Sequence, residues 1–409
     1  MPEPLESIDV VAERMVAGGS CIAHLDDGRV ALVEGALPGE RVEARVTEER
    51  PKMVTAAVEV VLDASSDRIA PPCAEVERGC GGCDLQYADP AAQPNLKVEV
   101  VRDALRRLAR LSDVPIDPGR ALPADGYRTT VRAAVRGGRA GFRARRSNDV
   151  VTVDSCMVAH PLVEEVLIDG RFDGATEVVV RVGARTGERM VVVSPNAESV
   201  SVPPDVRVVG TDELERGRRA WIHEELAGHR FRVSAQSFFQ ARPDGAEALV
   251  DAVRRALGDP GADAALVDLY GGVGLFSVAL GTRAPVLVER SASAVADARV
   301  NLAERDAMIL KMGVRRWRPV PADVVVADPA RSGLGVEGVA AVVGSGAPRV
   351  ALVSCDPASL ARDVGQLASV GYHPLGVELV DLFPRTHHLE AVTALELTED
   401  AADVVELHS

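Results

Sequence analysis

Apolar and polar residues alternate along residues 8–62, which is the period of strands with one buried face. Glycine-rich turns at residues 18–19, 26–28 and 37–39 separate the runs. Short strands divided in this way are typical of a small barrel of the oligonucleotide-binding type. We therefore predict an OB-like barrel over residues 1–62. The strand-like runs are residues 10–16, 29–33, 40–46 and 56–61.

The middle of the chain combines one helix with a second set of strands. Residues 90–111 have helical spacing, and proline-containing sequence then leads into runs that alternate with a period of two. The pattern predicts a central β-rich α+β domain over residues 91–228, preceded by a cysteine-bearing loop over residues 63–90. The alternating runs are residues 127–135, 140–144, 149–153, 177–182 and 189–193.

From residue 229 onward, strands and helices alternate, which is the order of a parallel sheet covered by helices. This order predicts a Rossmann-like domain over residues 229–409, and the fold class is therefore α/β with several domains. The expected strands are residues 265–269, 285–289, 322–327, 349–354 and 391–397, and the expected helices are residues 244–257, 275–280 and 360–367.

The composition is that of a soluble globular protein. The 409 residues suffice for several domains, and the hydrophobic fraction is 47%. No apolar run is long enough to span a bilayer, and the acidic N-terminus lacks the apolar segment of a secretory signal. We expect a cytoplasmic protein that acts as a monomer, without a membrane partner and with reduced thiols.

The formal charge of −15 argues against a protein that coats nucleic acid indiscriminately. Basic charge is nevertheless concentrated between residues 128 and 146. This stretch is a candidate RNA-binding surface, and a solvated surface without a ligand is the equally weighted alternative. Its arginines are Arg128, Arg132, Arg136, Arg139, Arg143, Arg145 and Arg146.

Three cysteines, Cys73, Cys80 and Cys83, share a loop with the spacing C-x6-C-G-G-C, and Cys156 is the obvious donor of a fourth thiolate. In a reducing compartment such a set indicates a metal site rather than disulfides. The two glycines let the backbone fold tightly enough for its N–H groups to approach the sulfurs of a cluster. Thiolate ligation is compatible with zinc or an iron–sulfur cluster, and the spacing alone does not decide between them.

Cys355 follows an apolar strand and precedes a helical stretch, so it lies at the carboxyl end of a strand near a helix start. Ligands and chemistry collect at that edge of open α/β sheets. A helix N-terminus is expected to lower the pKa of the thiol and make it more nucleophilic. This stretch alone fits a nucleophile and a small buried structural residue about equally well.

A strand, a glycine loop, a helix and a second strand ending in Glu289 follow one another between residues 265 and 289. Glycines allow close approach of a nucleotide to the backbone, and an acid at the end of the second strand can accept both ribose hydroxyls. The loop has the pattern D-x-Y-x-G-x-G from Asp268 to Gly274, which fits a methyltransferase cofactor better than a dinucleotide.

These motifs, in this order, resemble the 5-methyluridine RNA methyltransferase family, and the barrel resembles its RNA-binding TRAM domain. The resemblance spans nearly the whole chain. It includes the C-G-G-C loop with Cys156, the segments 238–240, 268–274, 328–331 and 354–357, the pair Arg362-Asp363, and the segment 388–390.

The resemblance implies S-adenosylmethionine and a [4Fe–4S] cluster as cofactors, with zinc as the less favoured metal. It implies that the Cys355 thiolate adds to C6 of a uracil and that Glu390 removes the C5 proton. Without it, a surface carboxylate would be the preferred reading of Glu390. His387 and His388 are expected to shape the loop before Glu390. The expected cofactor or base contacts are Gln240, Tyr270, Glu289 and Asp328.

The implied substrate is a uridine in RNA, with 23S ribosomal RNA preferred over transfer RNA. Because the thiol must reach C6, the base has to be flipped out or single-stranded. Two alternatives stay open: a non-catalytic RNA-binding protein with the same fold, and methylation of another nucleobase without a thiolate.

Three positions depart from the family's pattern. Gly271 stands where relatives often have cysteine, and Ala330 replaces the second proline of a D-P-P-R corner. Residues 301–322 are short and basic where relatives have another strand with an acid, so the adenine side of the cofactor pocket is expected to be incomplete. That stretch is the main support for the non-catalytic alternative.

Overall fold

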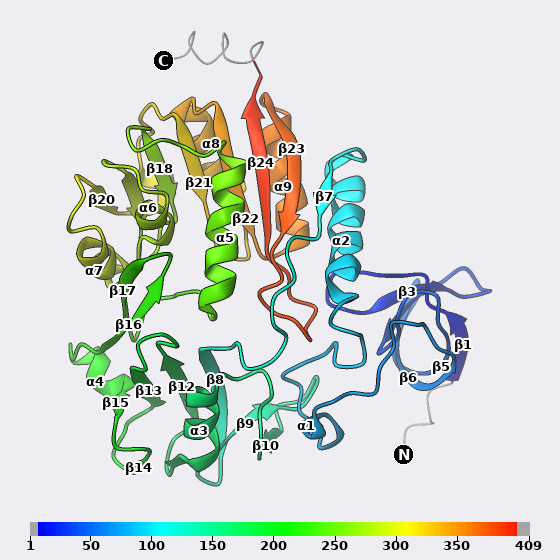
Figure 1. The fold of residues 1–409 in the computed structure, drawn as a ribbon. Helices are drawn as coiled ribbons and strands as arrows, with labels where there is room; N and C mark the ends of the chain where they lie inside the picture. Colours follow the sequence, from blue (N-terminus) through cyan, green and yellow to red (C-terminus); the bar gives the residue numbers. More distant parts are fainter. Residues whose placement is uncertain (1–6, 399–409) are drawn as a thin grey trace.

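The computed structural model describes residues 7–398. They form a barrel, a central domain and a large mixed sheet with helices (Figure 1). The predicted barrel is present, and the strand order of its sheet is β1-β5-β6-β4-β3-β2. Buried and exposed residues alternate along the first half of β5, as the sequence pattern requires. Its strands are β1 (Ser7–Val11), β2 (Arg14–Met15), β3 (Cys21–His24), β4 (Val30–Glu34), β5 (Arg41–Arg50) and β6 (Met53–Asp63).

The predicted helix at residues 90–111 consists of α2 (Gln93–Ala104) and a π-helical turn, η1 (Leu105–Ala109). The turn ends at Arg110, whose φ of 59° lies in the left-handed region and stops the helix. One side of α2 packs against β2 of the barrel and the other against a helix of the large sheet. The cysteine loop before it contains one short helix, α1 (Ala74–Glu77).

The central domain is built on a six-stranded sheet of order β10-β9-β8-β12-β13-β15. The five predicted strands are present, and the last strand of the sheet and two helices were not predicted. The elements are β8 (Thr130–Arg136), β9 (Arg139–Arg143), β10 (Val150–Thr152), β12 (Glu177–Val182), β13 (Arg189–Ser194), β15 (Val206–Gly210), α3 (Pro161–Asp169), α4 (Thr211–Glu215) and the small pair β11 (Arg171–Phe172) and β14 (Val200–Ser201).

A hairpin of β16 (Trp221–Leu226) and β17 (His229–Ser234) connects the central domain to the rest of the chain. The expected boundary between residues 228 and 229 falls in the turn of this hairpin, so the two paired strands cannot be divided there. The hairpin contacts α5 (Pro243–Ala256) and α7 (Ala292–Asn301) of the large sheet and also β12 and β13 of the central domain.

The large sheet has the order β20-β19-β18-β21-β22-β24-β23-β7, and β24 is antiparallel to both of its neighbours. Its strands are β18 (Leu266–Leu269), β19 (Val286–Glu289), β20 (Met308–Lys311), β21 (Val324–Ala327), β22 (Arg349–Ser354), β23 (Tyr372–Leu379), β24 (Ala391–Leu397) and β7 (Ile116–Asp117). The sheet runs parallel from β20 to β22, which confirms the Rossmann-like arrangement expected for this part of the chain.

Helices cover both faces of the large sheet (Figure 1). Two separate apolar cores result, one beneath α5, α6 and α7 and the other beneath α8 and α9. The helices are α5 (Pro243–Ala256), α6 (Leu275–Ala279), α7 (Ala292–Asn301), α8 (Gly335–Ser345) and α9 (Pro357–Ala368), with a 3-10 turn η2 (Val314–Arg316).

Two strands of the large sheet correct the sequence-based picture. Residues 301–322 contain β20, which pairs with β19, so the strand that we expected to be missing is present. It ends in Lys311 and therefore carries no acid at its carboxyl end. The second strand, β7, comes from the segment after α2 and extends the opposite edge, so the central part of the chain contributes to this sheet.

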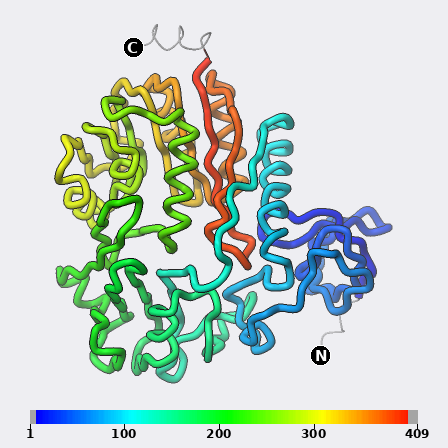
Figure 2. Tube along the Cα trace, in the orientation of Figure 1, coloured from blue at the N-terminus to red at the C-terminus, as the bar shows by residue number. Residues whose placement is uncertain are grey.

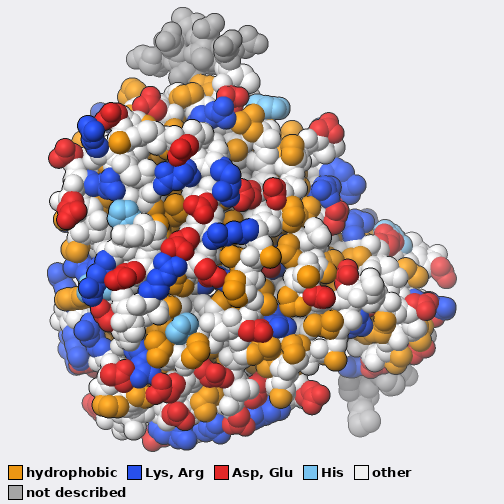
Figure 3. All heavy atoms as spheres, viewed as in Figure 1, with side chains coloured by type: hydrophobic (Ala, Val, Ile, Leu, Met, Phe, Trp, Pro, Cys, Tyr) orange, Lys and Arg blue, Asp and Glu red, His pale blue; other side chains and the backbone are white. Residues whose placement is uncertain are grey.

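The arginine-rich stretch forms the exposed side of the central sheet, and several of its charges are already paired. Arg132 bonds Glu177, Arg139 bonds Asp154, and Arg146 bonds Glu34 of the barrel. Over the face drawn in Figure 3, basic and acidic side chains are interspersed. Within residues 7–398, no helix has the length and apolarity needed to cross a membrane.

Candidate active site and cysteine loop

Three of the predicted cofactor-binding residues lie side by side at the carboxyl ends of neighbouring strands. The pairs Leu269↔Val288 and Leu269↔Ala327 are the last in register between β18 and its two neighbours. One residue further on, Tyr270 is therefore flanked by Glu289 and Asp328. The strand order reverses between β18 and β21, and ligands of open α/β sheets bind in the crevice at such a point.

The two predicted catalytic residues face each other across the next strands. β22 and β24 are antiparallel, and their pairing ends at Ser354↔Ala391. The next opposed positions are Cys355 and Glu390. Opposed residues of an antiparallel pair point to the same side of the sheet, so the register directs the thiol and the carboxyl to one place. Cys355 is half-buried and Glu390 is 6% exposed.

The predicted position of Cys355 between a strand and a helix is correct. β22 ends at Ser354 and α9 begins at Pro357. Between them, Asp356 caps the helix by accepting a hydrogen bond from the Ser359 N–H at 2.8 Å. The backbone turns sharply at this point, which leaves the thiol at the edge of the sheet.

The expected lowering of the thiol pKa is wrong. Burial, and then the negative charges of Glu390 and Asp328, raise the pKa of Cys355 to about 11. The Arg331 guanidinium acts in the opposite direction but does not outweigh them. Sequence reasoning considered only the helix dipole and missed the two acids that the fold brings to the thiol.

The acids at this edge repel one another and are poorly solvated. Burial and the charge of Asp268 raise the pKa of Asp328 to about 7. Burial and the charge of Asp328 raise the pKa of Glu390 well above its usual value, and Arg331 opposes that shift. A carboxyl group with a raised pKa can exchange protons near neutral pH, which is what general acid–base chemistry needs.

The glycine loop leaves open space above its backbone. Gly272 has a φ of +55°, and a Cβ at this position would meet no heavy atom within 4 Å. The neighbouring Glu289 carboxylate accepts hydrogen bonds from the N–H groups of Gly272 at 3.2 Å and Ser291 at 2.5 Å. Accessible glycine backbone beside an oriented carboxylate is a suitable site for the ribose of an adenosyl cofactor that carries no phosphate.

Gly271 differs from Gly272 in being tightly enclosed. A Cβ there would lie 2.6 Å from Cγ of Leu287 and 3.0 Å from the carboxyl carbon of Asp268. The absence of a side chain at this departure from the family's pattern is therefore required by the packing around it.

Tyr270 and Gln240 lie on opposite sides of the strand ends. The Tyr270 ring extends toward α8, where a Cβ on Gly338 would come within 2.9 Å of its hydroxyl. Gln240 is buried in the segment between β17 and α5. Two residues before it, Phe238 is 73% exposed, so this segment presents an aromatic ring to solvent. The sequence motif included Phe238, but its exposure could not be read from the pattern.

Two buried acids, to which the sequence pattern gave no role, hold the loops of this site, although the pair Arg362-Asp363 belongs to the family resemblance. Asp297 of α7 accepts hydrogen bonds from Ser234 and from the Ser237 hydroxyl, which fixes the segment that leads to Gln240. Asp363 of α9 accepts the N–H of Leu334 at 2.6 Å and so anchors the loop after Arg331. Both acids are completely buried, and in the sequence they resemble ordinary helix residues.

The four predicted metal ligands come together around the end of β9. Cys83 lies close enough to Cys73, Cys80 and Cys156 for their charges to affect its titration, and burial raises its pKa to about 12. Burial likewise raises the pKa of Cys156 to about 11. Gly81 donates its N–H to the Arg143 carbonyl at 3.0 Å, and a Cβ there would lie 2.6 Å from the same oxygen. The first glycine of C-G-G-C therefore permits close docking on the central sheet.

A buried glutamate connects the two parts of the cysteine set. The Glu75 carboxylate accepts the N–H groups of Asp154 at 2.9 Å and Ser155 at 3.2 Å, directly before Cys156. Four thiols held in this way are a suitable donor set for a thiolate-ligated metal centre. Among the described residues, no three His, Cys, Asp or Glu side chains are arranged around one point as the ligands of a single ion would be.

The two histidines before Glu390 have different surroundings. His387 forms an ion pair with Asp84, the residue after Cys83. His388 is half-buried, and burial, with the charges of His387 and Arg331, lowers its pKa to about 4. This neutral ring packs edge-on against Phe383, at 6.1 Å between ring centroids. Both residues shape the loop, in agreement with the sequence-based expectation.

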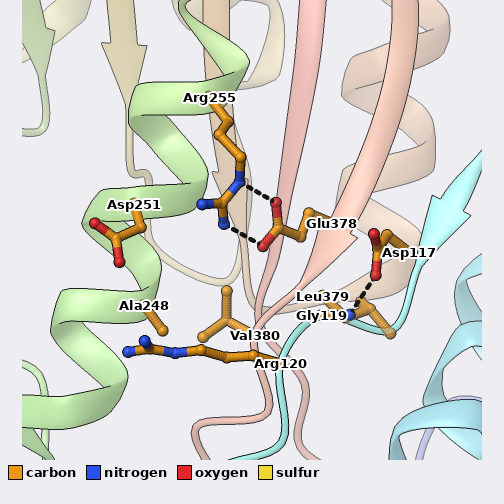
Figure 4. A pocket seen from close by; sticks show the side chains of 9 residues that line it. All are labelled: Asp117, Gly119, Arg120, Ala248, Asp251, Arg255, Glu378, Leu379 and Val380. Atoms are coloured by element: carbon orange, nitrogen blue, oxygen red, sulfur yellow. Dashed lines mark hydrogen bonds and ion pairs between the residues drawn. The ribbon is translucent and has the colours of Figure 1, made fainter. Parts of the chain in front are cut away.

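A cavity of about 280 Å³ lies between α5 and the β23–β7 edge (Figure 4). Two of its charged groups pair with each other, Arg255 with Glu378 at 2.6 Å, and Arg120 donates to the backbone carbonyl of Asp244 at 3.1 Å. None of the predicted site residues lines it. The cavity is therefore separate from the carboxyl-edge site.

Comparison with known proteins gives matches over nearly the whole chain. A family model for the TRAM domain matches residues 9–58. An uncharacterized RNA methyltransferase of Streptomyces avermitilis is 39% identical, over 96% of this chain and 98% of the relative. The 23S rRNA (uracil(1939)-C(5))-methyltransferase RlmD of Halomonas elongata is 31% identical, over 96% of this chain and 90% of the relative.

A solved structure has the same fold. The tRNA (uracil-54, C5)-methyltransferase of Pyrococcus abyssi, in complex with S-adenosyl-L-homocysteine, matches with a TM-score of 0.70 and 23% sequence identity. The match covers 95% of this chain and 100% of that structure. The predicted fold class, an N-terminal TRAM barrel with a C-terminal methyltransferase fold, is confirmed.

Proposed function

The chain belongs to the RNA methyltransferase family that includes the Halomonas elongata enzyme, and we propose that it transfers a methyl group from S-adenosylmethionine to C5 of a uridine in RNA. The observation that carries this proposal is the register that opposes Cys355 and Glu390 beside Asp328, at the carboxyl edge of the sheet. A thiol next to acids of raised pKa provides both a nucleophile and a base.

Cys355 starts the reaction in this proposal. After its proton has passed to solvent, the thiolate forms a bond from Sγ to C6 of the uracil, and the C5–C6 π electrons move toward C5 and the C4 carbonyl. Arg331 favours the thiolate, because its positive charge acts against the raised pKa of the thiol. The activated C5 is then nucleophilic enough to be methylated.

S-Adenosylmethionine, when bound, would supply the methyl group to C5, with cleavage of its S–CH3 bond and release of S-adenosylhomocysteine. Gly272 and the oriented Glu289 carboxylate are proposed to hold its adenosine part, with Gln240, Tyr270 and Asp328 as further contacts. The support is the open backbone at Gly272 and the position of Glu289 and Asp328 on either side of Tyr270.

Glu390 ends the reaction. Its carboxylate removes the proton from the methylated C5, the C5–C6 double bond reforms, and the electrons of the S–C6 bond return to Cys355. The burial of Glu390 supports this role, because a poorly solvated carboxylate is a stronger base than an exposed one.

The cysteine set is proposed to hold a [4Fe–4S] cluster through Cys73, Cys80, Cys83 and Cys156. The proximity of Cys83 to the other three cysteines and the glycine-bearing loop support this assignment, and zinc is the alternative. Iron and sulfide analysis of anaerobically purified protein, together with its visible absorbance, distinguishes the two. If the protein is colourless and contains one zinc per chain, the site binds zinc and not an iron–sulfur cluster.

Ribosomal RNA is the proposed substrate, in preference to transfer RNA, and the reaction is proposed to occur in the cytoplasm. The relatives' RNA methyltransferase activity supports an RNA substrate. Action as a monomer is part of the proposal, because Cys355, Glu390 and Asp328 all come from one chain. Sedimentation of the active protein tests the oligomeric state.

The decisive experiment mixes the protein with S-adenosylmethionine and 5-fluorouracil-substituted ribosomal or transfer RNA. Fluorine at C5 prevents the final proton loss, so the adduct is trapped and is visible by denaturing mass analysis. We expect a covalent protein–RNA species that disappears in Cys355→Ala, with loss of turnover by about 10⁴-fold or more. Mapping the adduct identifies the RNA and the uridine.

Cys21→Ala is the matched control, because this buried cysteine lies in the barrel and its thiol donates to the Ala36 carbonyl. It should form the adduct like the wild type. If the adduct forms on transfer RNA alone, transfer RNA and not ribosomal RNA is the substrate. Absence of an adduct on both RNAs, in protein shown to bind metal and cofactor, would favour the non-catalytic RNA-binding alternative.

A further inference from the structure

The segment that carries Glu390, residues 380–390, is closed at its base by the large sheet, where the Val380 N–H donates to the Glu390 carbonyl at 2.8 Å, and its other residues contact parts of the chain outside that sheet. We call this segment the Glu390 loop. In Figures 1 and 2 it leaves the lower end of β23 and lies between the large sheet, the central domain and the base of α2. Its position therefore depends on contacts that cross between units of the molecule.

Three of these contacts fix the first half of the loop. The buried Lys97 ammonium of α2 donates to the Asp381 carboxylate at 2.7 Å. The Tyr127 hydroxyl of the central domain donates to the Pro384 carbonyl at 3.1 Å. The N–H of Leu85, in the cysteine loop, donates to the Arg385 carbonyl at 2.9 Å.

The second half is held by one residue of the cysteine loop, Asp84. Its carboxylate accepts the backbone N–H of His387 at 2.8 Å and also bonds the Nδ1 atom of the same residue. Asp84 thus fixes both the backbone and the ring of His387. The barrel closes the other side, because a Cβ on Gly19 would lie 2.8 Å from the Cβ of His387.

Only two residues separate His387 from Glu390, and beyond Glu390 the chain enters β24. The Val380 N–H fixes the Glu390 carbonyl at 2.8 Å, so the sheet holds one end of this residue, and His387 acts on it from the N-terminal side. A displacement of about 1 Å at a reacting group is enough to cost about a hundredfold in rate. The contact at His387 is consequently in a position to control the proton-removal step.

We propose that Asp84 is a positioning residue for this step: by binding His387 it ties the cysteine loop to the Glu390 loop and holds Glu390 at C5 of the bound uracil. The inference rests on the proposed role of Glu390. Asp84 moves no proton itself. Addition of Cys355 to C6 and methylation of C5 need no base at Glu390, and only the final loss of the C5 proton and the breaking of the S–C6 bond do.

The step that fails distinguishes this role from a merely structural one. If Asp84 positions Glu390, Asp84→Ala forms the covalent protein–RNA complex on ordinary, unfluorinated RNA but releases it slowly. We expect the rate of release to fall by about 10- to 100-fold. The complex should therefore accumulate to nearly one per enzyme, as it should in Glu390→Gln. A general loss of folding would lower adduct formation and release together.

The experiment follows the covalent complex on denaturing gels with full-length, metal-loaded protein, ribosomal RNA and S-adenosylmethionine. Asp84→Asn should recover part of the release rate, because an amide oxygen can still accept the His387 N–H. Asp154→Ala is the matched control. Asp154 is also an acid beside the cysteine set, but its carboxylate bonds Arg78 and Arg139. Its variant should behave like the wild type.

His387→Ala tests the same contact without altering the cysteine loop, and metal content per chain is measured for every variant. His387→Ala should accumulate the covalent complex too. The double variant Asp84→Ala/His387→Ala should release the RNA no more slowly than the slower of the two single variants. The inference is overturned if metal-loaded Asp84→Ala and His387→Ala release the complex at the wild-type rate. It is also overturned if adduct formation and release fall together in these variants. If Glu390→Gln itself fails to accumulate the complex, the role of Glu390 is wrong instead.

Discussion

The cofactor half and the base half of the site are built in different ways. Glu289, Tyr270 and Asp328 stand in a row because three parallel strands end at the same edge, and their positions follow from backbone register. Glu390, the proposed base, stands at the same edge directly before β24, and the loop that leads to it is bound by α2, the cysteine loop and the central domain. The proposed cofactor half is local to one sheet, whereas the proposed base half also has contacts with other units of the molecule.

This difference has a functional consequence. Residues at strand ends are held by the sheet whether or not the other units are docked, so cofactor binding should survive changes in the interfaces. The base, in contrast, should lose its position when any of these contacts is weakened. Proton removal is therefore the step most exposed to damage elsewhere in the chain.

The largest effect that separates the halves is expected from Glu390→Gln. Loss of a general base typically costs about 10²- to 10⁴-fold, so turnover should fall by that amount while cofactor affinity is retained. The carboxylate is the active form, and burial with the Asp328 charge raises its pKa. Wild-type turnover should thus rise with pH, and the variant should lose the part of this rise that comes from Glu390 while keeping the part that comes from the Cys355 thiolate. Steady-state methylation between about pH 5 and 9 measures it, a range that spans the ordinary and the raised pKa of a carboxyl group; near-wild-type turnover would contradict the role.

The sequence reveals the two halves to different degrees for the same reason. Glu289, Asp328 and Cys355 each follow an apolar run, so the pattern alone puts them at strand ends. Glu390 is found only through the family resemblance, because the loop before it is held by residues that are distant in the sequence. Residues 84 and 387, for example, are 303 positions apart. Lys97 looks like a surface residue of an amphipathic helix until Asp381 is seen beside it.

Two of the strands that were not expected, β7 and β20, are short edge strands of the large sheet; the longer β23 and the strands β15, β16 and β17 were not expected either. β7 has two residues, and it exists because the neighbouring edge of β23 accepts its hydrogen bonds. β20 is a run of only three apolar residues before Lys311, which is too short to identify as a strand before its pairing with β19 is seen. Sheet edges of this kind are decided by tertiary pairing and not by local preference.

The second prediction tests how firmly the Glu390 loop is anchored. Lys97 and Asp381 are 2% and 8% exposed, and removal of one partner leaves the other charge buried. We expect Lys97→Met to lower the free energy of unfolding by about 3 to 5 kcal/mol. Urea unfolding measures this. The double variant Lys97→Met/Asp381→Leu should recover much of the stability, because an apolar pair carries no desolvation cost.

The exposed ion pair between Arg41 and Asp9 in the barrel provides the control for Lys97→Met. Arg41→Met removes a positive charge of the same kind, but both partners of this pair remain in contact with water. It should change the free energy of unfolding far less than Lys97→Met does, since exposed ion pairs contribute little. Equal losses in the two variants would mean that the Lys97 contact is no stronger than a surface pair.

The third prediction concerns the cofactor half of the site, which we also call the strand-edge half because strand ends form it, and the pH dependence of the free energy of unfolding. Burial raises the pKa of Asp268 from 3.8 to about 6, so between these values the folded state keeps a proton that the unfolded chain has lost. Stability from this group is full at low pH and is lost as the pH rises through that window. The loss amounts to at most about 3 kcal/mol.

Asp268→Asn removes the titration while keeping an oxygen that can accept from Ser277. The difference in unfolding free energy between variant and wild type should therefore grow in favour of the variant from about pH 4 to pH 7, the window in which the wild-type carboxyl loses its proton. Urea unfolding at several pH values measures it. A difference that stays constant with pH would show that Asp268 does not titrate in this range.

The smallest effect is expected at Gly271, where the strand-edge half is most tightly packed. A Cβ at this position would lie 2.6 Å from Cγ of Leu287, so Gly271→Cys should lower the free energy of unfolding by about 1 to 3 kcal/mol. Gly272→Cys is not a matched control, because Gly272 has a positive φ, but Leu287→Ala in the Gly271→Cys background is informative. That second change makes room for the thiol and should recover part of the loss beyond what the two single changes predict. If the two changes were simply additive, the contact with Leu287 would not be what excludes a side chain, and the strand-edge half would be looser than its geometry indicates.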